Sequence, residues 1–187
     1  RKSGITSLEN GKTKYTSNSG LITLRQEISK YINRKCGVEY HPENEVLLSV
    51  GGSEAIDVAL RAVVNPGDEV IIPQPSYVCY EPITELLGGV PVIIETRAED
   101  DFKVTPEQLT KAISPKTKAL VLPYPCNPTG AIMGRDDLEA LAQILRDTNI
   151  LVISDEIYSE LTFSGKPHVS IASIDGMCER TVIVNRK

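Results

Sequence analysis

The sequence has no long hydrophobic run. Its apolar stretches are short, and none approaches the roughly 18–20 consecutive apolar residues that a helix needs to span a bilayer. The first ten residues, RKSGITSLEN, contain no apolar segment of the kind found in secretory signal peptides. We therefore expect neither a membrane protein nor a secreted one.

Basic charge and metal-binding residue types are also scarce. The 20 Lys and Arg residues are outnumbered by 25 Asp and Glu residues, and no basic cluster offsets the net charge of -5. This balance argues against nucleic acid or an anionic membrane surface as a partner. The four cysteines are far apart with no CxxC pair, and there are only two histidines, so we expect no metal site. Free thiols in a reducing cytoplasm are the simplest interpretation.

What the sequence does contain is an alternation of short β-branched runs and helical patterns. The expected strands are 46–50, 69–72, 90–94, 118–122, 150–154 and 181–184. The expected helices are 21–35, 53–64, 76–87, 106–113 and 135–147. Strands separated by helices of about ten residues are typical of βαβ units, with a mostly parallel sheet and helices on both faces. The predicted fold class is therefore α/β, a three-layer sandwich, and 187 residues suit one domain.

Residues between these elements fit the same plan. Thr105, followed by Pro106 and by Gln108 at the third helical position, predicts a capping box at the start of the helix 106–113. In parallel sheets covered by helices, ligands bind beyond the carboxyl ends of the strands. The residues that follow each expected strand are therefore the candidates for a functional site.

The sequence Gly51-Gly52-Ser53-Glu54-Ala55 leads directly from the first expected strand into a helix. The N–H groups at a helix start can bind an anion, and two glycines allow it to approach closely. A tight turn capped by the Ser53 side chain is the alternative interpretation. The pattern is neither GxGxxG nor a P-loop, which argues against dinucleotides and nucleoside triphosphates.

Three further strand ends carry aromatic or polar side chains. Tyr77 falls in the first turn of the helix expected at 76–87, where it either packs or lies against a planar ligand. Asn127 lies in the stretch YPCNPTG, which either ends a strand or holds the asparagine amide rigid against a ligand. Asp155 and Tyr158 follow the strand expected at 150–154. A carboxylate at the end of a buried strand needs a hydrogen-bonding or positive partner, and a capped turn is the alternative explanation for both residues.

Together these residues would gather different chemical groups at one edge of one sheet. The groups are an anion cradle, an aromatic ring, an amide, a carboxylate and a phenol. This set suits a phosphorylated, planar, cationic heteroaromatic cofactor. Pyridoxal 5′-phosphate meets that description, with Asp155 pairing the pyridinium nitrogen so that the ring remains an electron sink.

The sequence resembles the class I/II aminotransferases, which are pyridoxal-phosphate enzymes of the aspartate-aminotransferase fold (fold type I). It is most similar to the bacterial branch that includes PatA-type enzymes, and the resemblance runs from Gly11 to Asn185. The motifs that carry it occur in the family's order and spacing. They are Tyr15-Thr16, Gly20, Leu24-Arg25, Gly51-Gly52-Ser53-Glu54-Ala55, Pro75-Ser76-Tyr77, Asn127-Pro128-Thr129-Gly130 and Ser154-Asp155-Glu156-Ile157-Tyr158.

The resemblance implies that two of these motifs hold the phosphate and the ring face of the cofactor. The backbone N–H groups of Gly52, Ser53 and Glu54 would bind the phosphate. Tyr77 would stack on the pyridine ring. Family members are homodimers with active sites at the interface, so Tyr15 would reach the phosphate of the neighbouring subunit.

The resemblance also implies how the ring's polar atoms are held. Asn127 and Tyr158 would hydrogen-bond the phenolate oxygen, and Asp155 would pair with the ring nitrogen. The Asn127–Pro128 peptide bond would be cis. The prolines of this stretch would thereby fix an amide against the cofactor.

The sequence departs from the family pattern after the strand expected at 181–184. In the family a Ser-Lys pair follows, and its lysine forms the Schiff base and carries the proton. Here the residues are Val184-Asn185-Arg186-Lys187, so Lys187 is too close to the strand and has no serine before it. We therefore expect no catalytic lysine in this chain, and we expect residues 1–187 to be an incomplete large, cofactor-binding domain. The small C-terminal domain and the antiparallel strand that lies between 181–184 and 46–50 in the family would be absent.

Three functions remain open after this comparison of motifs. The leading one is an aminotransferase of amino-acid metabolism, whose complete form transfers an amino group between an amino acid and a 2-oxo acid and whose isolated chain is inactive. The second is a pyridoxal-phosphate-dependent carbon–sulfur β-lyase of the same fold. The third is a non-catalytic remnant that binds the cofactor. An NAD-binding domain would share the sheet, but the glycine fingerprint is missing.

Overall fold

The computed structural model describes residues 1–163 and 165–186, which divide into two units. The first unit comprises residues 1–35 and 39–48, and the second comprises residues 36–38 and 49–187. Lys187, which the sequence places too close to the preceding strand for a Schiff base, lies outside the described residues.

The first unit contains helix α1 (Lys2–Glu9), helix α2 (Ile22–Cys36) and the irregular segment 39–48. Helix α2 was expected from its apolar spacing, whereas α1, which buries no residue, was not. The side chain of Leu48 occupies the space in which a Cβ atom on Gly20 would lie, and Gly20 has a φ of 92°, so only glycine fits there. The buried Arg25 donates through Nη1 to the carbonyl oxygens of Pro42 and Glu43, both at 3.1 Å. These contacts hold the segment 39–48 against α2.

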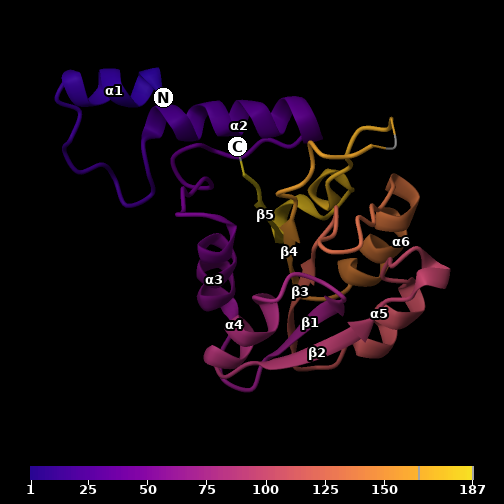
Figure 1. Ribbon diagram of the computed structural model, residues 1–187. Coiled ribbons are helices and arrows are strands. Elements are labelled where there is room, and N and C mark those ends of the chain that lie inside the picture. The colour runs from indigo at the N-terminus through magenta and orange to yellow at the C-terminus, as the bar shows by residue number, and fades with distance from the viewer. Residues whose placement is uncertain (164, 187) are drawn as a thin grey trace. The chain divides into compact units, whose positions relative to one another are not determined.

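The second unit is built on a sheet of five parallel strands in the order β2-β1-β3-β4-β5. The strands are β1 (Glu69–Gln74), β2 (Val90–Glu95), β3 (Thr117–Leu122), β4 (Leu151–Asp155) and β5 (Thr181–Val184). Figure 1 shows the strands side by side at the centre of this unit. All five were predicted from the sequence to within two residues at either end.

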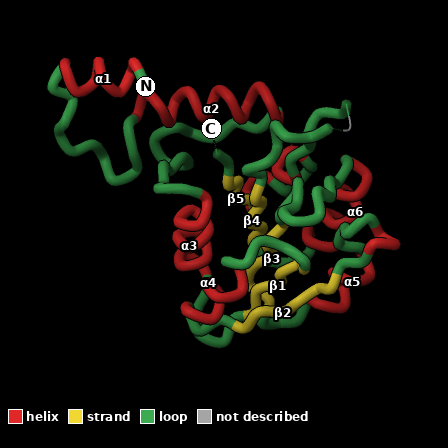
Figure 2. Tube along the Cα trace, in the orientation of Figure 1, coloured by secondary structure: helices red, strands yellow, loops and turns green. Residues whose placement is uncertain are grey.

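Helices cover both faces of this sheet (Figure 2). On one face lie α3 (Gly52–Val63) and α4 (Tyr80–Leu86), and on the other lie α5 (Pro106–Ala112) and α6 (Arg135–Arg146). Short 3-10 helices occur at Ala98–Asp100, Ile171–Ser173 and Cys178–Arg180. Side chains alternate along a strand, so Val70 and Ile72 pack in the α3/α4 core while Ile71 packs in the α5/α6 core. The expected three-layer α/β sandwich is confirmed.

The strand expected at 46–50 is not formed. Leu47 and Val50 are exposed, and the backbone donors of this stretch bond elsewhere: the Leu48 N–H donates to Ser19 and the Val50 N–H to the Glu54 carboxylate. None of the five described strands pairs with it. An apolar run becomes a strand only when a neighbour accepts its backbone hydrogen bonds, and the described sheet offers none here.

The strand order places a topological switch point between β1 and β3. From β1 the chain crosses to β2 on one side, and it then returns to form β3 on the other side of β1. Ligands of parallel sheets bind in the crevice outside the carboxyl ends of the strands at such a point. The segments that follow β1, β3 and β4 therefore converge where a site is expected.

Within residues 1–163 and 165–186, no helix is both long enough and apolar enough to cross a membrane. No group of three or more His, Cys, Asp or Glu residues in the same ranges is placed to hold a metal ion. All four cysteines are free thiols.

Candidate cofactor site

The N-terminus of α3 lies open at the edge of the sheet. The helix begins at Gly52, and its N-cap residue Gly51 has a φ of 96°, which favours glycine. No side chain caps the helix, so the first N–H groups, those of Gly52, Ser53 and Glu54, have no intrahelical acceptor. A helix start with free N–H groups attracts an anion. The alternative expectation, that Ser53 caps the helix, is wrong because Ser53 lies within the first turn.

The Ser53 side chain instead faces Tyr77, with 3.4 Å between the two hydroxyl oxygens. Tyr77 was expected in the first turn of a helix, but α4 begins only at Tyr80 and Tyr77 lies in the preceding loop. The long-range contact with Ser53 holds Tyr77 outside the helix. The rings of Tyr77 and Tyr80 also form a T-shaped pair, with centroids 6.0 Å apart and planes at 81°. Tyr77 remains partly exposed beside the start of α3.

Asp155 ends β4 and is buried. Its Oδ2 atom accepts a 2.8 Å hydrogen bond from the Tyr80 hydroxyl, and its Oδ1 atom accepts a 3.3 Å bond from the Ile157 N–H. Burial raises the pKa of Asp155, and these two hydrogen bonds oppose the rise. No Lys or Arg among the described residues pairs with it. The turn at Ile157 satisfies one oxygen, yet the carboxylate still lacks a positive partner.

Cys79 lies near both the start of α3 and the end of β4, because it interacts with Ser53 and with Asp155. Burial raises the pKa of its thiol to about 11; the nearby Asp155 carboxylate adds to the rise, and a hydrogen bond with the Ser53 side chain opposes it. A Cβ atom on Gly52 would lie 3.6 Å from Cγ2 of Ile157, two residues after Asp155. Ser53, Tyr77 and Asp155 therefore surround one small region.

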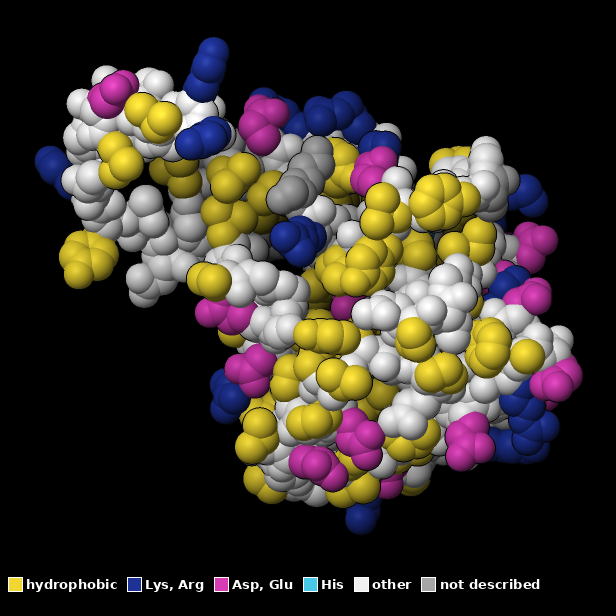
Figure 3. Space-filling view, in the orientation of Figure 1, with side chains coloured by type: hydrophobic (Ala, Val, Ile, Leu, Met, Phe, Trp, Pro, Cys, Tyr) yellow, Lys and Arg dark blue, Asp and Glu magenta, His cyan; other side chains and the backbone are white. Residues whose placement is uncertain are grey.

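Asn127 and Tyr158 line a neighbouring pocket of about 450 Å³. Its other lining residues are mostly apolar: Pro125, Cys126, Pro128, Gly130, Ile132, Leu161, Thr162 and Phe163. Neither the Asn127 amide nor the Tyr158 hydroxyl hydrogen-bonds any described residue, so both are available to a ligand. On the face of the second unit that Figure 3 shows, hydrophobic side chains lie in groups between acidic ones.

The loop after β3 connects this pocket with the Tyr77 loop. Cys126 lines the pocket, and its Sγ atom lies 3.4 Å from the carbonyl oxygen of Pro75. The Asn127–Pro128 bond is cis, as expected. The structure thus brings the candidates at 52–54, 77, 127, 155 and 158 to one edge of the sheet. Tyr15, fully exposed, belongs to the first unit, which is described by itself.

Tyr80 is a site residue that the sequence did not reveal. Burial raises the pKa of its phenol well above the ordinary value, with the Asp155 charge as a second cause, so the hydroxyl stays protonated and donates to Asp155. The sequence shows only a second tyrosine three residues after Tyr77, and this spacing is typical of ordinary helix packing. Only the fold shows that its hydroxyl reaches a carboxylate 75 residues later.

Known proteins have similar sequences and a similar fold. The sequence model of the family described as "Aminotransferase class I and II" matches residues 2–185. The chain is 43% identical over 182 residues to an aspartate aminotransferase of Bacillus sp. (strain YM-2), covering 97% of this chain and 46% of that protein. It is 43% identical over 178 residues to a Bacillus subtilis (strain 168) protein named "Probable N-acetyl-LL-diaminopimelate aminotransferase", covering 95% and 44%. The crystal structure of an aromatic aminotransferase from Pyrococcus horikoshii OT3 matches with a TM-score of 0.93 and 40% identity, covering 96% of this chain and 48% of that one. The chain spans about half the length of these relatives.

Proposed function

The chain belongs to the class I and II aminotransferases, and from this premise we propose that the whole protein transfers an amino group between an amino acid and a 2-oxo acid with pyridoxal phosphate. One observation carries the proposal. Asp155 is a buried carboxylate without a described cation, and it lies at the same sheet edge as an open helix N-terminus. A cofactor with both a phosphate and a cationic ring nitrogen satisfies both features.

The donor set fits pyridoxal phosphate group by group. The N–H groups at 52–54 and the Ser53 hydroxyl suit a phosphate, and the Tyr77 ring suits the face of a planar ring. The uncommitted Asn127 amide and Tyr158 hydroxyl can both donate to a ring oxygen.

When bound, pyridoxal phosphate supplies an aldehyde that condenses with amino groups and a ring that withdraws electrons from the reacting carbon. Asp155 would keep the ring nitrogen protonated, because a positive partner would stabilise its buried carboxylate. Tyr80 holds the Asp155 carboxylate in place through its 2.8 Å hydrogen bond. Asn127 and Tyr158 would stabilise negative charge on the ring oxygen.

Further parts of the proposal concern the whole protein. We propose a cytoplasmic homodimer in which Tyr15 contacts the cofactor of the neighbouring subunit, and the four free thiols support a reducing compartment. No Ser-Lys pair occurs at 185–187, so we propose that the catalytic lysine is not among residues 1–187. Sedimentation of the whole protein with pyridoxal phosphate tests the dimer.

An assay of the whole protein separates the enzyme functions. The relatives' names differ in the amino donor, so the panel should contain aspartate, an aromatic amino acid and a diaminopimelate derivative, each with 2-oxoglutarate. We expect glutamate to form with at least one donor. Thiol release from a cysteine thioether without glutamate formation would favour the β-lyase instead. If neither glutamate formation nor thiol release is observed, the proposed activity is contradicted.

A further inference from the structure

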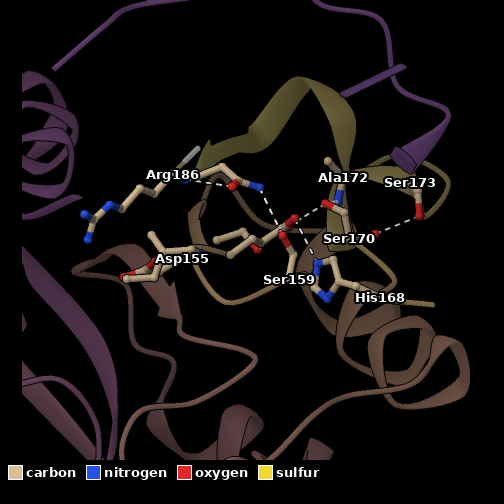
Figure 4. A network of polar contacts seen from close by, with 11 residues as sticks. Asp155, Ser159, His168, Ser170, Ala172, Ser173 and Arg186 are labelled. Carbon is tan, nitrogen blue, oxygen red and sulfur yellow. Dashed lines mark hydrogen bonds and ion pairs between the residues drawn. The ribbon is translucent and has the colours of Figure 1, made fainter. Parts of the chain in front are cut away.

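The Glu156 carboxylate is almost completely buried, at 1% exposure, directly after Asp155. Its Oε1 atom accepts hydrogen bonds from the Ser154 hydroxyl at 2.8 Å and the Ser170 hydroxyl at 2.5 Å. Its Oε2 atom lies 2.9 Å from Nε2 of His168. In Figure 4 the labelled side chains of His168 and Ser170 lie close together, whereas that of Asp155 points away from both. We call Glu156, Ser154, His168 and Ser170 the Glu156 cluster.

The Glu156 cluster is not a catalytic triad despite its residue types. Ser170 donates to the carboxylate rather than to the imidazole, so His168 cannot activate it. Ser170 is also 1% exposed and therefore cannot meet a substrate. The cluster must act through the backbone to which it is attached.

That backbone is the turn that carries two proposed cofactor contacts. Glu156 lies between Asp155 and Tyr158, and its N–H donates to the Val184 carbonyl oxygen at 2.8 Å. The Ser159 N–H donates to the Glu156 carbonyl oxygen at 2.9 Å, and the Asn185 amide donates to the Ser159 hydroxyl at 3.2 Å. The Glu156 side chain thus anchors one side of a turn whose other side presents Asp155 and Tyr158.

We propose that Glu156, held by His168 and Ser170, is a positioning residue that fixes the turn 155–158 so that Asp155 and Tyr158 meet the cofactor together. The inference rests on the proposed function. Three side-chain partners of the carboxylate and two backbone hydrogen bonds leave the turn little freedom. A displacement of about 1 Å at a reacting centre is enough to cost 100-fold in activity.

Variants of His168 test this role because the residue lies at the outer side of the Glu156 cluster. H168A removes the donor, H168Q restores an N–H donor, and S173A is the matched control. Ser173 bonds the Ser170 carbonyl oxygen at 2.7 Å in the same segment but does not touch Glu156. The readouts are the affinity of the protein for pyridoxal phosphate and the induced circular dichroism of the bound cofactor, both at a temperature where melting curves show every variant folded.

We expect H168A to bind pyridoxal phosphate about 10-fold more weakly, with a changed circular dichroism band, as supporting partners of a site typically contribute. H168Q should recover most of the affinity, and S173A should match the wild type. If H168A does not fold, H168N, which keeps the polarity but is too short to reach Glu156, should show the same loss. Wild-type affinity and an unchanged band in the folded H168A or H168N protein would overturn the positioning role alone. Failure of the wild type to bind would overturn the proposed function, and the positioning role with it.

Discussion

At the scale of single residues, the second unit buries a carboxylate and gives it only neutral partners. Asp155 accepts from Tyr80 and from the Ile157 backbone, and burial still raises its pKa. Without a cation, such a residue lowers stability, because burying a charge that is not paired is costly. The residue is therefore better explained by a positive ligand than by folding.

Replacement of Asp155 by asparagine should change how stability depends on pH. The raised pKa means that the folded chain keeps a proton that the unfolded chain releases, so the contribution of Asp155 is fully present below its ordinary pKa of 3.8 and is lost as the pH rises through the folded-state pKa. D155N has no ionisable group there. Urea unfolding of cofactor-free protein should show the stability of D155N rising relative to wild type as the pH increases above 3.8.

The Y80F variant should change the pH dependence of stability in the opposite direction to D155N. It removes the hydrogen bond that lowers the Asp155 pKa, so the loss of stability with rising pH should become larger, by about 1.5–3 kcal/mol for a hydrogen bond to a charged group. Equal pH dependence in wild type, D155N and Y80F would contradict the burial of an unpaired charge.

Cys79 offers a chemical probe of the same region. Because burial and the Asp155 charge raise its pKa to about 11, its alkylation rate should reach half-maximum near pH 11 rather than near the ordinary thiol value of about 8.5. D155N should lower that midpoint, while burial keeps it above the ordinary value. Peptide mass spectrometry after iodoacetamide pulses measures each cysteine separately. Cys178, which precedes β5 at the opposite end of the sheet, is the control, and D155N should not change its alkylation. If D155N leaves the alkylation midpoint of Cys79 unchanged, the Asp155 charge does not influence this thiol.

At the scale of elements, local signals decide where helices begin. The Thr105 side chain accepts from the Gln108 N–H at 3.2 Å, and the Gln108 side chain accepts from the Thr105 N–H at 3.0 Å. The capping box predicted from the sequence is confirmed. Both partners lie within one turn, so nothing distant is needed to form it.

Removal of this cap should cost a measurable part of the stability. T105A leaves the Gln108 N–H without its acceptor, and we expect a loss of about 1 kcal/mol in the free energy of unfolding. T110A, in the same helix, removes only a bond to the Pro106 carbonyl oxygen and should change the stability by less than about 0.5 kcal/mol. Equal effects in urea unfolding would show that the cap does not contribute.

The difference between local contacts and contacts between distant residues explains what the sequence could and could not predict. Strands with strong apolar runs, such as β3 and β4, were predicted because their signals are local, whereas the cis Asn127–Pro128 bond was expected only from the resemblance to a family. The segment 46–50 has the same pattern but no described neighbour, so it forms no strand. The positions of Ser53, Tyr77 and Tyr80 depend on contacts between distant parts of the chain, and no spacing in the sequence reveals those contacts.

At the scale of the whole molecule, the parallel sheet turns scattered motifs into one site. The segments after β1, β3 and β4 meet beside the N-terminus of α3, because all these strands run in the same direction. The relatives share this arrangement over the half of their length that the chain matches. We therefore propose that the groups that bind the cofactor gather in this part of the protein, apart from the catalytic lysine.

Borohydride reduction tests this separation. With pyridoxal phosphate present, we expect no stoichiometric covalent product at any single lysine of the 187-residue chain, because no Ser-Lys pair follows β5 within it. Peptide mass spectrometry locates any product. A clean stoichiometric adduct at Lys187 would show that the chain carries its own catalytic lysine.

The most direct measurement is a crystal structure of the chain grown with pyridoxal phosphate. We predict the phosphate at the N–H groups of 52–54, the ring against Tyr77, and the ring nitrogen within hydrogen-bond distance of Asp155. A cofactor bound with its phosphate elsewhere, or with a ring nitrogen that does not meet Asp155, would contradict the proposed site.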